Sequence, residues 1–255
     1  MIEVTDLYKE FNGVPVLKGV STTFEKGVTS MIIGQSGSGK TVFLKCLVGL
    51  HIPESGIICF DGRKHTELDI KEKRLLRQEI GMVFQGGALY DSLTVEENIM
   101  FPLKMFADQS FSEMRDRVNF VLKRVNLEDA NKKFPAELSG GMQKRVSIAR
   151  AIVMNPKYLF CDEPNSGLDP NTATVIDNLI KEITDEYQII TVVNTHDMNS
   201  IMEIGEKIIF LKDGVKEWEG TNKEIFSTEN EAVVNFVYSS NLFKKVREAY
   251  LNETK

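Results

Sequence analysis

The sequence lacks any long hydrophobic run. Its longest apolar stretches, such as VTSMII and KIIFL, have the length of a β-strand. A membrane-spanning helix needs roughly 18 or more consecutive apolar residues, so we expect no transmembrane segment. The opening residues, MIEVTDLYKEF, carry Glu3 and no apolar core of a secretion signal, so we expect no signal peptide either. Any membrane role is therefore expected to depend on a partner protein.

Basic clusters and paired cysteines are also missing. The 255 residues carry a formal net charge of −6, without a block of lysines and arginines. Binding along a nucleic acid needs a basic stripe, so we expect no nucleic-acid partner. Cys46, Cys59 and Cys161 are three scattered cysteines whose spacing fits neither disulfides nor a metal site. A reducing compartment, the cytosol, fits best.

Short β-rich segments alternate with amphipathic helical patterns along the chain. The predicted strands are residues 2–4, 29–33, 56–60, 81–84, 158–161, 189–194 and 207–211. The predicted helices are residues 39–50, 71–78, 112–125, 139–154, 171–186 and 198–204. This alternation predicts an α/β fold with a mostly parallel sheet.

The domain organisation follows from where the strand signal stops. Residues 88–150 have helical patterns and almost no strand signal, so we interpret them as a helical subdomain inserted into the α/β core. We predict one domain over residues 1–230, which is an ordinary domain size. A helical C-terminal extension, residues 231–255, follows. Its apolar face either packs on its own core or crosses to a second copy of the chain.

The stretch GQSGSGKT, Gly34 to Thr41, matches the phosphate-binding pattern G-x-x-x-x-G-K-[ST] in full. A predicted strand enters it and a predicted helix leaves it. Glycines let backbone N–H groups converge on phosphate oxygens, and the helix N-terminus favours negative charge. We expect Lys40 to reach the β- and γ-phosphates and Thr41 to bind Mg²⁺.

The stretch YLFCDEP places two carboxylates at the end of a predicted strand. Asp162 stands where open α/β sheets bind ligands and can hold Mg²⁺ from the second shell. Glu163 follows at once and can polarise an attacking water as a general base. The alternative is a solvated acidic turn before Pro164.

The stretch LSGGMQKR begins a long predicted helix. Ser139 is a suitable N-cap, and Gly140 and Gly141 expose N–H groups at a second helix N-terminus. The chain therefore contains a second candidate anion site, which one bound nucleotide does not explain.

Together, these three motifs resemble those of ABC-type ATPases over almost the whole chain. The resemblance implies a RecA-like P-loop core with an antiparallel β-subdomain and an inserted helical subdomain. It also implies ATP and Mg²⁺ as ligands, and a head-to-tail homodimer that sandwiches two ATP molecules.

The resemblance implies a role for each matching residue. Catalysis is expected from Glu163, His196, Gln85 and Lys40, with Thr41, Gln85 and Asp162 around the metal. The expected ATP-binding residues are Phe11, Gly34, Gln35, Ser36, Gly37, Ser38, Gly39, Lys40, Thr41 and Val42. The signature loop facing the opposite protomer would be Leu138, Ser139, Gly140, Gly141 and Met142. Asp169 would belong to the D-loop that couples the two sites, and Phe11 would stack on adenine unless it is a core residue.

The subfamily is suggested by finer features. Met142 replaces the usual glutamine of the signature, and FQGGALYDSLTVEENIMFPL, LSGGM with Arg145 and THDMNSIMEIGEKIIFLKDG resemble Mla-type phospholipid-transport ATPases. This implies phospholipid transport between inner and outer membranes, an Mla-type permease, an MCE-domain lipid-binding protein, and a position on the cytoplasmic face of the inner membrane. The alternatives are a small-solute importer ATPase, for example for amino acids, or a non-transport ABC ATPase of the cell-division or cluster-assembly kind.

Gln85 ends a buried-looking strand and is followed by Gly86 and Gly87, which give the next segment freedom to shift. Ala88, Leu89 and Tyr90 then form an apolar group. We expect this group to dock a permease helix; the alternative is that it belongs to the core of the helical subdomain.

Overall fold

The structure is a computed structural model that describes residues 1–238 and residue 245. The chain divides into two compact units, residues 1–67 with 192–255 and residues 68–191, and the division falls within one strand, β8 (Ile190–Asn194). Each unit is described below by itself. The predicted domain limits stay a prediction.

The first unit begins with an antiparallel sheet in the strand order β2-β1-β4-β5. Its strands are β1 (Ile2–Phe11), β2 (Val14–Phe24), β4 (Ser55–Phe60) and β5 (Arg63–Lys64). Asn12 and Gly13 join β1 to β2 with φ angles of 52° and 77°, the left-handed geometry that tight hairpins need. This sheet supplies the antiparallel β-subdomain implied by the resemblance.

The predicted strand over residues 2–4 is too short, because β1 runs on to Phe11. A register shift between Val4 and Leu7, with Asp6 at a φ of 47°, interrupts the in-out alternation of the strand. The alternation of apolar and polar residues along β1 is therefore divided into two segments, and each segment is short. The whole of β2 was missed for a related reason, since its first half is mostly exposed.

The first unit also holds the strands β10, β9 and β3 and the last three residues of β8, and these strands are neighbours in that order. All five residues of β3 (Thr29–Ile33) are buried, and β3 runs parallel to β9 (Lys207–Lys212) with Ile32 opposite Ile209. The last strand, β10 (Val215–Gly220), has no buried residue and was missed by the sequence analysis. The helices of this unit are α1 (Lys40–Leu47), α7 (Met198–Ile204), α8 (Glu224–Ser227) and α9 (Glu231–Val237).

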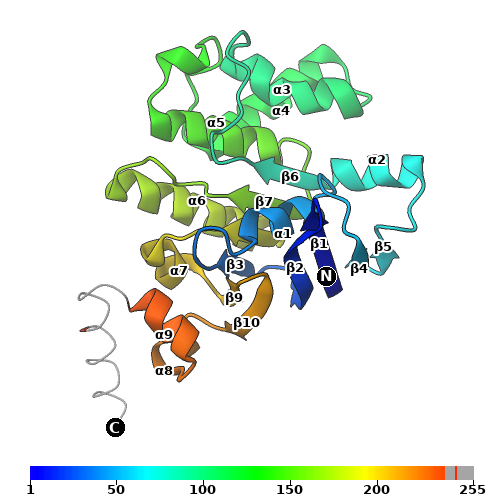
Figure 1. The fold of residues 1–255 in the computed structure, drawn as a ribbon. Helices are drawn as coiled ribbons and strands as arrows, with labels where there is room; N and C mark the ends of the chain where they lie inside the picture. The colour runs from blue at the N-terminus through cyan, green and yellow to red at the C-terminus, as the bar shows by residue number, and fades with distance from the viewer. Residues whose placement is uncertain (239–244, 246–255) are drawn as a thin grey trace. The chain divides into compact units, whose positions relative to one another are not determined.

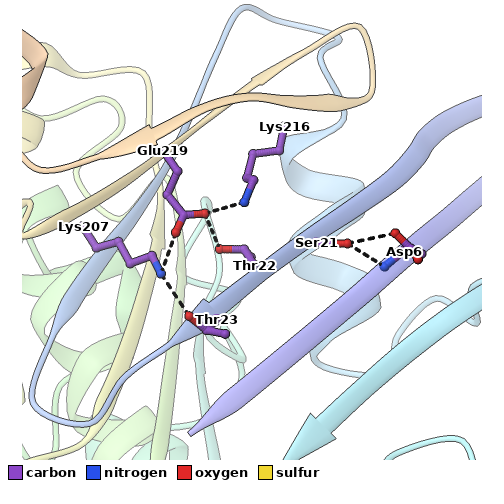
Figure 2. A network of polar contacts seen from close by, with 7 residues as sticks. All are labelled: Asp6, Ser21, Thr22, Thr23, Lys207, Lys216 and Glu219. Atoms are coloured by element: carbon purple, nitrogen blue, oxygen red, sulfur yellow. Dashed lines mark hydrogen bonds and ion pairs between the residues drawn. The ribbon is translucent and has the colours of Figure 1, made fainter. Parts of the chain in front are cut away.

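A polar network joins β2 to the β9–β10 hairpin (Figure 2). The Glu219 carboxylate accepts hydrogen bonds from Lys207 at 2.9 Å, Lys216 at 2.7 Å and the Thr22 hydroxyl at 2.9 Å. Burial raises the pKa of Glu219, but these bonds outweigh it and hold the pKa below its ordinary value. Lys207 also donates to the Thr23 hydroxyl, so one carboxylate and one ammonium connect both parts of the unit.

The second unit contains two parallel strands, β6 (Ile80–Val83) and β7 (Tyr158–Asp162), and most of the helices. The helices are α2 (Ile70–Gln78), α3 (Val95–Phe106), α4 (Phe111–Arg124), the short 3₁₀ helix η1 (Pro135–Glu137), α5 (Gly140–Ile152) and α6 (Pro170–Tyr187). The helices α3, α4 and α5 pack on one another and form the green group in Figure 1. Helices α3 and α4 lie within the predicted helical segment 88–150, and α5 runs two residues beyond it, to Ile152.

Three helices of this unit, α2, α3 and α4, begin with the same chemical pattern. Asp69, Thr94 and Ser110 are N-caps, and each forms a capping box with the glutamate three residues later. Each box satisfies two backbone or side-chain donors at the helix start, which is why these helices begin where they do.

The described start of the C-terminal extension packs on its own unit. In α9, Val233 and Val237 are buried, and the ring of Phe236 lies 5.3 Å from that of Phe210. The Tyr238 hydroxyl donates to the Ile225 carbonyl at 2.9 Å. Residues 239–244 and 246–255 lie outside the described residues, so the predicted helical extension beyond Tyr238 stays a prediction. No helix in the described part of the chain is long and apolar enough to cross a membrane.

We predict that Asn98→Ala lowers the free energy of unfolding by about 2 kcal/mol or more, since it leaves buried polar groups without partners. Asn98 is fully buried in α3. Its amide accepts from the Tyr90 N–H and donates to the carbonyls of Tyr90, Leu93 and Thr94. Urea unfolding measures the change.

Asn178→Ala is the matched control, because Asn178 is an exposed helical asparagine in α6. Its change in unfolding free energy should stay within about 0.5 kcal/mol. Equal effects of the two substitutions would contradict the structural role given to Asn98.

Candidate functional site

The loop between β3 and α1 needs glycine at two positions because other backbone passes close by. Gly34 has a φ of 147°, and a Cβ there would lie 2.2 Å from the carbonyl oxygen of Leu211. At Gly39, with a φ of 100°, a Cβ would lie 3.1 Å from the carbonyl oxygen of Val16. Gly34 and Gly39 of the predicted phosphate cradle are thus required by the packing of the loop against its own unit.

Lys40 begins α1 and is buried, with 9% of its surface exposed. Its ammonium donates to the carbonyls of Gly34 at 2.9 Å and Gln35 at 3.0 Å, both within the loop. Both of these hydrogen bonds tie the lysine to the backbone of the loop itself. Among the described residues, the Ser38 hydroxyl is a buried group with no hydrogen-bond partner. A phosphate would provide that partner, so the cradle fits the nucleotide expected from the sequence.

Thr41 follows Lys40 in α1, and its hydroxyl accepts from the side-chain amide of Asn194 at 3.2 Å. Asn194 ends β8, and His196 stands two residues later with its side chain exposed. Hydrogen bonds from the Thr195 N–H to Ile32 and from the Asp197 N–H to the Thr195 hydroxyl shape this turn. Asn194 was not among the predicted site residues; a polar residue at a strand end next to His196 was the available signal.

Phe11 ends β1 with 39% of its surface exposed, so the alternative that it is a core residue is wrong. The Lys9 ammonium lies 4.9 Å from the centre of the Phe11 ring, and the ring of His51 meets it edge-on at 5.3 Å. Lys9 is held in turn by Glu54 at 2.5 Å. Burial and the nearby Lys45 and Lys9 lower the pKa of His51, so the neutral imidazole is favoured. The exposed ring is therefore a pre-positioned apolar platform.

In the second unit, Asp162 ends β7 and Glu163 follows it, and the two residues are 7% and 9% exposed. The alternative of a solvated acidic turn is therefore wrong. Glu163 has a φ of 49°, a left-handed conformation that is uncommon for a glutamate. The Ser166 N–H donates to its carbonyl at 3.2 Å and helps to close the turn. Uncommon backbone geometry at such a position is frequent at functional sites.

The signature residues surround the N-terminus of α5. Ser139 is the N-cap and accepts from the Met142 N–H at 3.3 Å, and Leu138 is buried beneath it. Gly140 is exposed, whereas a Cβ on Gly141 would lie 2.5 Å from the methyl group of Thr172. Thr172 belongs to the first turn of α6, so this helix start leaves no room for a side chain at Gly141.

Asp169 caps α6 and accepts from the Thr172 N–H at 3.1 Å and the Thr172 hydroxyl at 2.6 Å. These hydrogen bonds hold the pKa of Asp169 below its ordinary value. Because Thr172 also contacts Gly141, the predicted signature loop and D-loop are neighbours within this unit.

Gln85 follows β6 and is exposed, and the chain then turns, with the Gly87 N–H donating to the Phe84 carbonyl at 2.8 Å. Lys144 of α5, which the sequence analysis missed, donates to the Gln85 carbonyl. Burial lowers the pKa of Lys144, although the nearby Cys161 and Glu163 oppose this shift. The available signal was a lysine in register with the buried residues Ser147 and Ala151 of α5.

These arrangements define the class of protein before any comparison. A glycine-rich phosphate cradle with a buried lysine, together with a buried carboxylate pair at a strand end, is the machinery of a P-loop nucleoside triphosphatase. A family profile described as ABC transporter matches residues 17–166. The chain therefore belongs to the ABC transporter family, and it is an ATPase.

Proteins similar to this chain include import and transport ATP-binding proteins. The methionine import ATP-binding protein MetN 2 of Bacillus cereus is 40% identical over 227 residues, which cover 89% of this chain and 67% of the relative. The probable ribonucleotide transport ATP-binding protein mkl of Mycobacterium tuberculosis is 41% identical over 198 residues, which cover 78% of this chain and 55% of the relative.

Solved structures confirm the predicted ABC ATPase fold. The dimeric structure of MJ0796, a bacterial ABC transporter cassette, has a TM-score of 0.80 at 37% identity, over 87% of this chain and 99% of that one. The structure of cbiO1 from Clostridium perfringens has a TM-score of 0.82 at 30% identity, over 98% of each chain. The same MJ0796 cassette is also known in a post-hydrolysis state bound to ADP and Pi.

The expected Mla membership does not gain support from these comparisons. The similar proteins with a stated cargo include methionine importers, which match the small-solute alternative better than the phospholipid interpretation. The comparisons confirm that the chain is an ABC transporter ATPase, but they do not confirm its subfamily.

We predict that Gly34→Ala lowers the free energy of unfolding by about 2 kcal/mol or more, because its Cβ collides with backbone and its φ is strained. Thermal or urea unfolding without nucleotide measures the effect. Gly37→Ala is the control: its φ of 81° is also left-handed, but a Cβ there meets nothing within 4 Å. It should lose only about 1 kcal/mol. An equal loss at both positions would contradict the close-approach explanation.

Proposed function

We propose that this chain is the ATP-hydrolysing subunit of an ABC transporter and works as a head-to-tail homodimer on a separate membrane permease. The observation that carries the proposal is the presence of two anion-binding helix starts in one chain, at α1 and at α5. One nucleotide needs only the first of them. The second is explained if it closes on ATP held by another copy, and the dimeric MJ0796 cassette supports this arrangement.

In this proposal the P-loop and Lys40 bind the phosphates of ATP, and Phe11 stacks on the adenine. Mg²⁺ would be held by Thr41, with Asp162 and Gln85 around it, and it would neutralise the developing charge on the phosphates. No group of three or more acidic, histidine or cysteine ligands was found among the described residues. Mg²⁺ is commonly bound through one or two side chains, phosphate oxygens and water.

Glu163 is the proposed general base, with His196 and Gln85 aligning the attacking water. The left-handed backbone at Glu163 fixes the direction in which its carboxylate leaves β7. Signature residues Leu138 to Met142 and Asp169 of the D-loop would serve the site that the chain shares with its partner.

The permease would dock in an apolar groove of about 310 Å³ in the second unit. Tyr90 is 47% exposed at this groove, and its ring lies 5.0 Å from that of Phe101. The other lining residues include Met82, Phe84, Ala88, Met105 and Phe106. This exposure favours docking over the alternative that the Ala88–Tyr90 group is subdomain core. Docking there would place the chain on the cytoplasmic face of a membrane.

The cargo has two candidates. A small organic solute such as an amino acid is favoured by the methionine-import relatives. Phospholipid is the second candidate, and it rests on the resemblance of residues 84–103 to Mla-type ATPases, with an Mla-type permease and an MCE-domain protein as partners.

We predict that Glu163→Gln keeps ATP binding but lowers the turnover number by about 100-fold or more, because it removes the general base. Phosphate release measures turnover, and fluorescent-nucleotide titration measures binding. Lys40→Ala is the contrasting variant and should weaken ATP binding itself, by about tenfold or more. Hydrolysis by Glu163→Gln near the wild-type rate would refute Glu163 as the base.

The cargo and the permease are tested by purifying the tagged chain with its partners from native membranes and identifying them by mass spectrometry. A permease with a solute-binding protein supports the small-solute reading. A permease with an MCE-domain protein and bound phospholipid supports the second candidate. Recovery of the chain without any permease would contradict the transport function.

A further inference from the structure

Three polar side chains lie along one face of α5 and point at the same piece of backbone. Lys144, Ser147 and Arg150 are spaced three residues apart, so they follow one another along the helix. All three donate to main-chain carbonyls of residues 85–88, which we call the Q segment. The four bonds are Lys144 Nζ to Gln85 O, Ser147 Oγ to Gly87 O at 3.2 Å, Arg150 Nη2 to Gly87 O at 2.7 Å and Arg150 Nη1 to Ala88 O at 2.7 Å.

The surroundings make these bonds strong. Lys144 is 6% exposed and Ser147 is fully buried, so water competes little for the donors. Two of the three donors are cations, and hydrogen bonds from charged groups are stronger than neutral ones. Leaving a buried ammonium without its carbonyl would be costly. The Q segment is therefore firmly attached to α5.

The Q segment itself has little structure of its own to hold it. Gly87 has a φ of 75° and Ala88 a φ of 47°, which is unfavourable for an alanine. A Cβ on Gly86 would meet nothing within 4 Å, so that residue has room to move. The shape of this segment thus depends on the three donors of α5.

The same helix carries the signature motif at its other end. Ser139 caps α5, and Gly140 to Met142 form its first turn. A 13-residue helix moves as a stiff unit, because each turn is hydrogen-bonded to the next. A displacement of the signature motif is therefore passed on to the donors farther along α5 and to the backbone that they hold.

We propose that Lys144, Ser147 and Arg150 are positioning residues that couple the signature motif to Gln85 of the same chain. ATP engaged by the signature motif then sets the position of Gln85, so that the two ATP sites of a dimer are linked through one helix. This inference rests on the proposed roles of the signature motif and of Gln85. The physical element that both sites bias is the strained Q segment.

The test is hydrogen–deuterium exchange of residues 84–90 in the Glu163→Gln protein, in which hydrolysis is blocked, with and without Mg²⁺ and ATP. We expect ATP to change the exchange rate of this peptide by about tenfold or more in the parent protein. Adding Lys144→Met should make the exchange faster and independent of ATP, while ATP-dependent dimerisation is kept. In the otherwise wild-type protein, Lys144→Met should lower kcat with little change in KM for ATP.

Arg145→Met is the matched control. Arg145 is the next residue of α5 and donates to the Asn126 carbonyl at 3.1 Å, away from the Q segment. The variant should keep the ATP-dependent exchange of the parent. If Lys144→Met does not fold, Ser147→Ala takes its place. This variant removes one neutral hydrogen bond, so we expect a smaller loss of the ATP-dependent change in exchange.

The outcomes separate this inference from the proposed function. A Glu163→Gln parent that neither binds ATP nor dimerises would overturn the proposed function and this inference with it. Suppose instead that the parent dimerises, and that ATP changes the exchange of residues 84–90 equally in Lys144→Met, Ser147→Ala and Arg145→Met. This result would overturn the inference alone. So would a dimerising parent whose residues 84–90 do not respond to ATP.

Discussion

The candidate ATP site depends on the close approach of the P-loop to β9. At Gly34 the loop backbone runs so near the Leu211 carbonyl that no Cβ fits between them. This contact fixes how the chain leaves β3, which fixes where α1 begins and where Lys40 and Thr41 point. A backbone constraint of one residue thus sets the geometry of the phosphate cradle.

In both units, cationic side chains donate to main-chain carbonyls. Lys40 donates to two carbonyls of its own loop, and Lys144 and Arg150 donate to carbonyls of residues 85–88. In the first unit these bonds tie Lys40 to the phosphate-binding loop, and in the second unit they hold a strained backbone segment.

Much of the fold was readable from sequence because its helices carry local signals. The capping residue Ser139 marks the start of α5, and continuous apolar runs mark buried strands such as β3. Helix α3 was not among the predicted helices, although its cap Thr94 was an available signal. The hairpin of β1 and β2 was mostly missed, since a bulge near Asp6 breaks the alternation. The exposed strand β10 gave no apolar pattern at all. The predicted phospholipid cargo rested on the similarity of short motifs, and it received less support than the predicted membership of the ABC family.

The sequence by itself determined the chemistry of this protein, because phosphate binding and hydrolysis need particular residue types at fixed local spacing. The P-loop, the pair Asp162 and Glu163 and the signature are each contiguous, so no tertiary knowledge was needed to find them. Only the tertiary structure decided which side chains are exposed to solvent, Phe11 among them. It also decided that Lys144 donates to the backbone carbonyl of Gln85. Those contacts join residues far apart in the chain, and no local pattern encodes the distance between them.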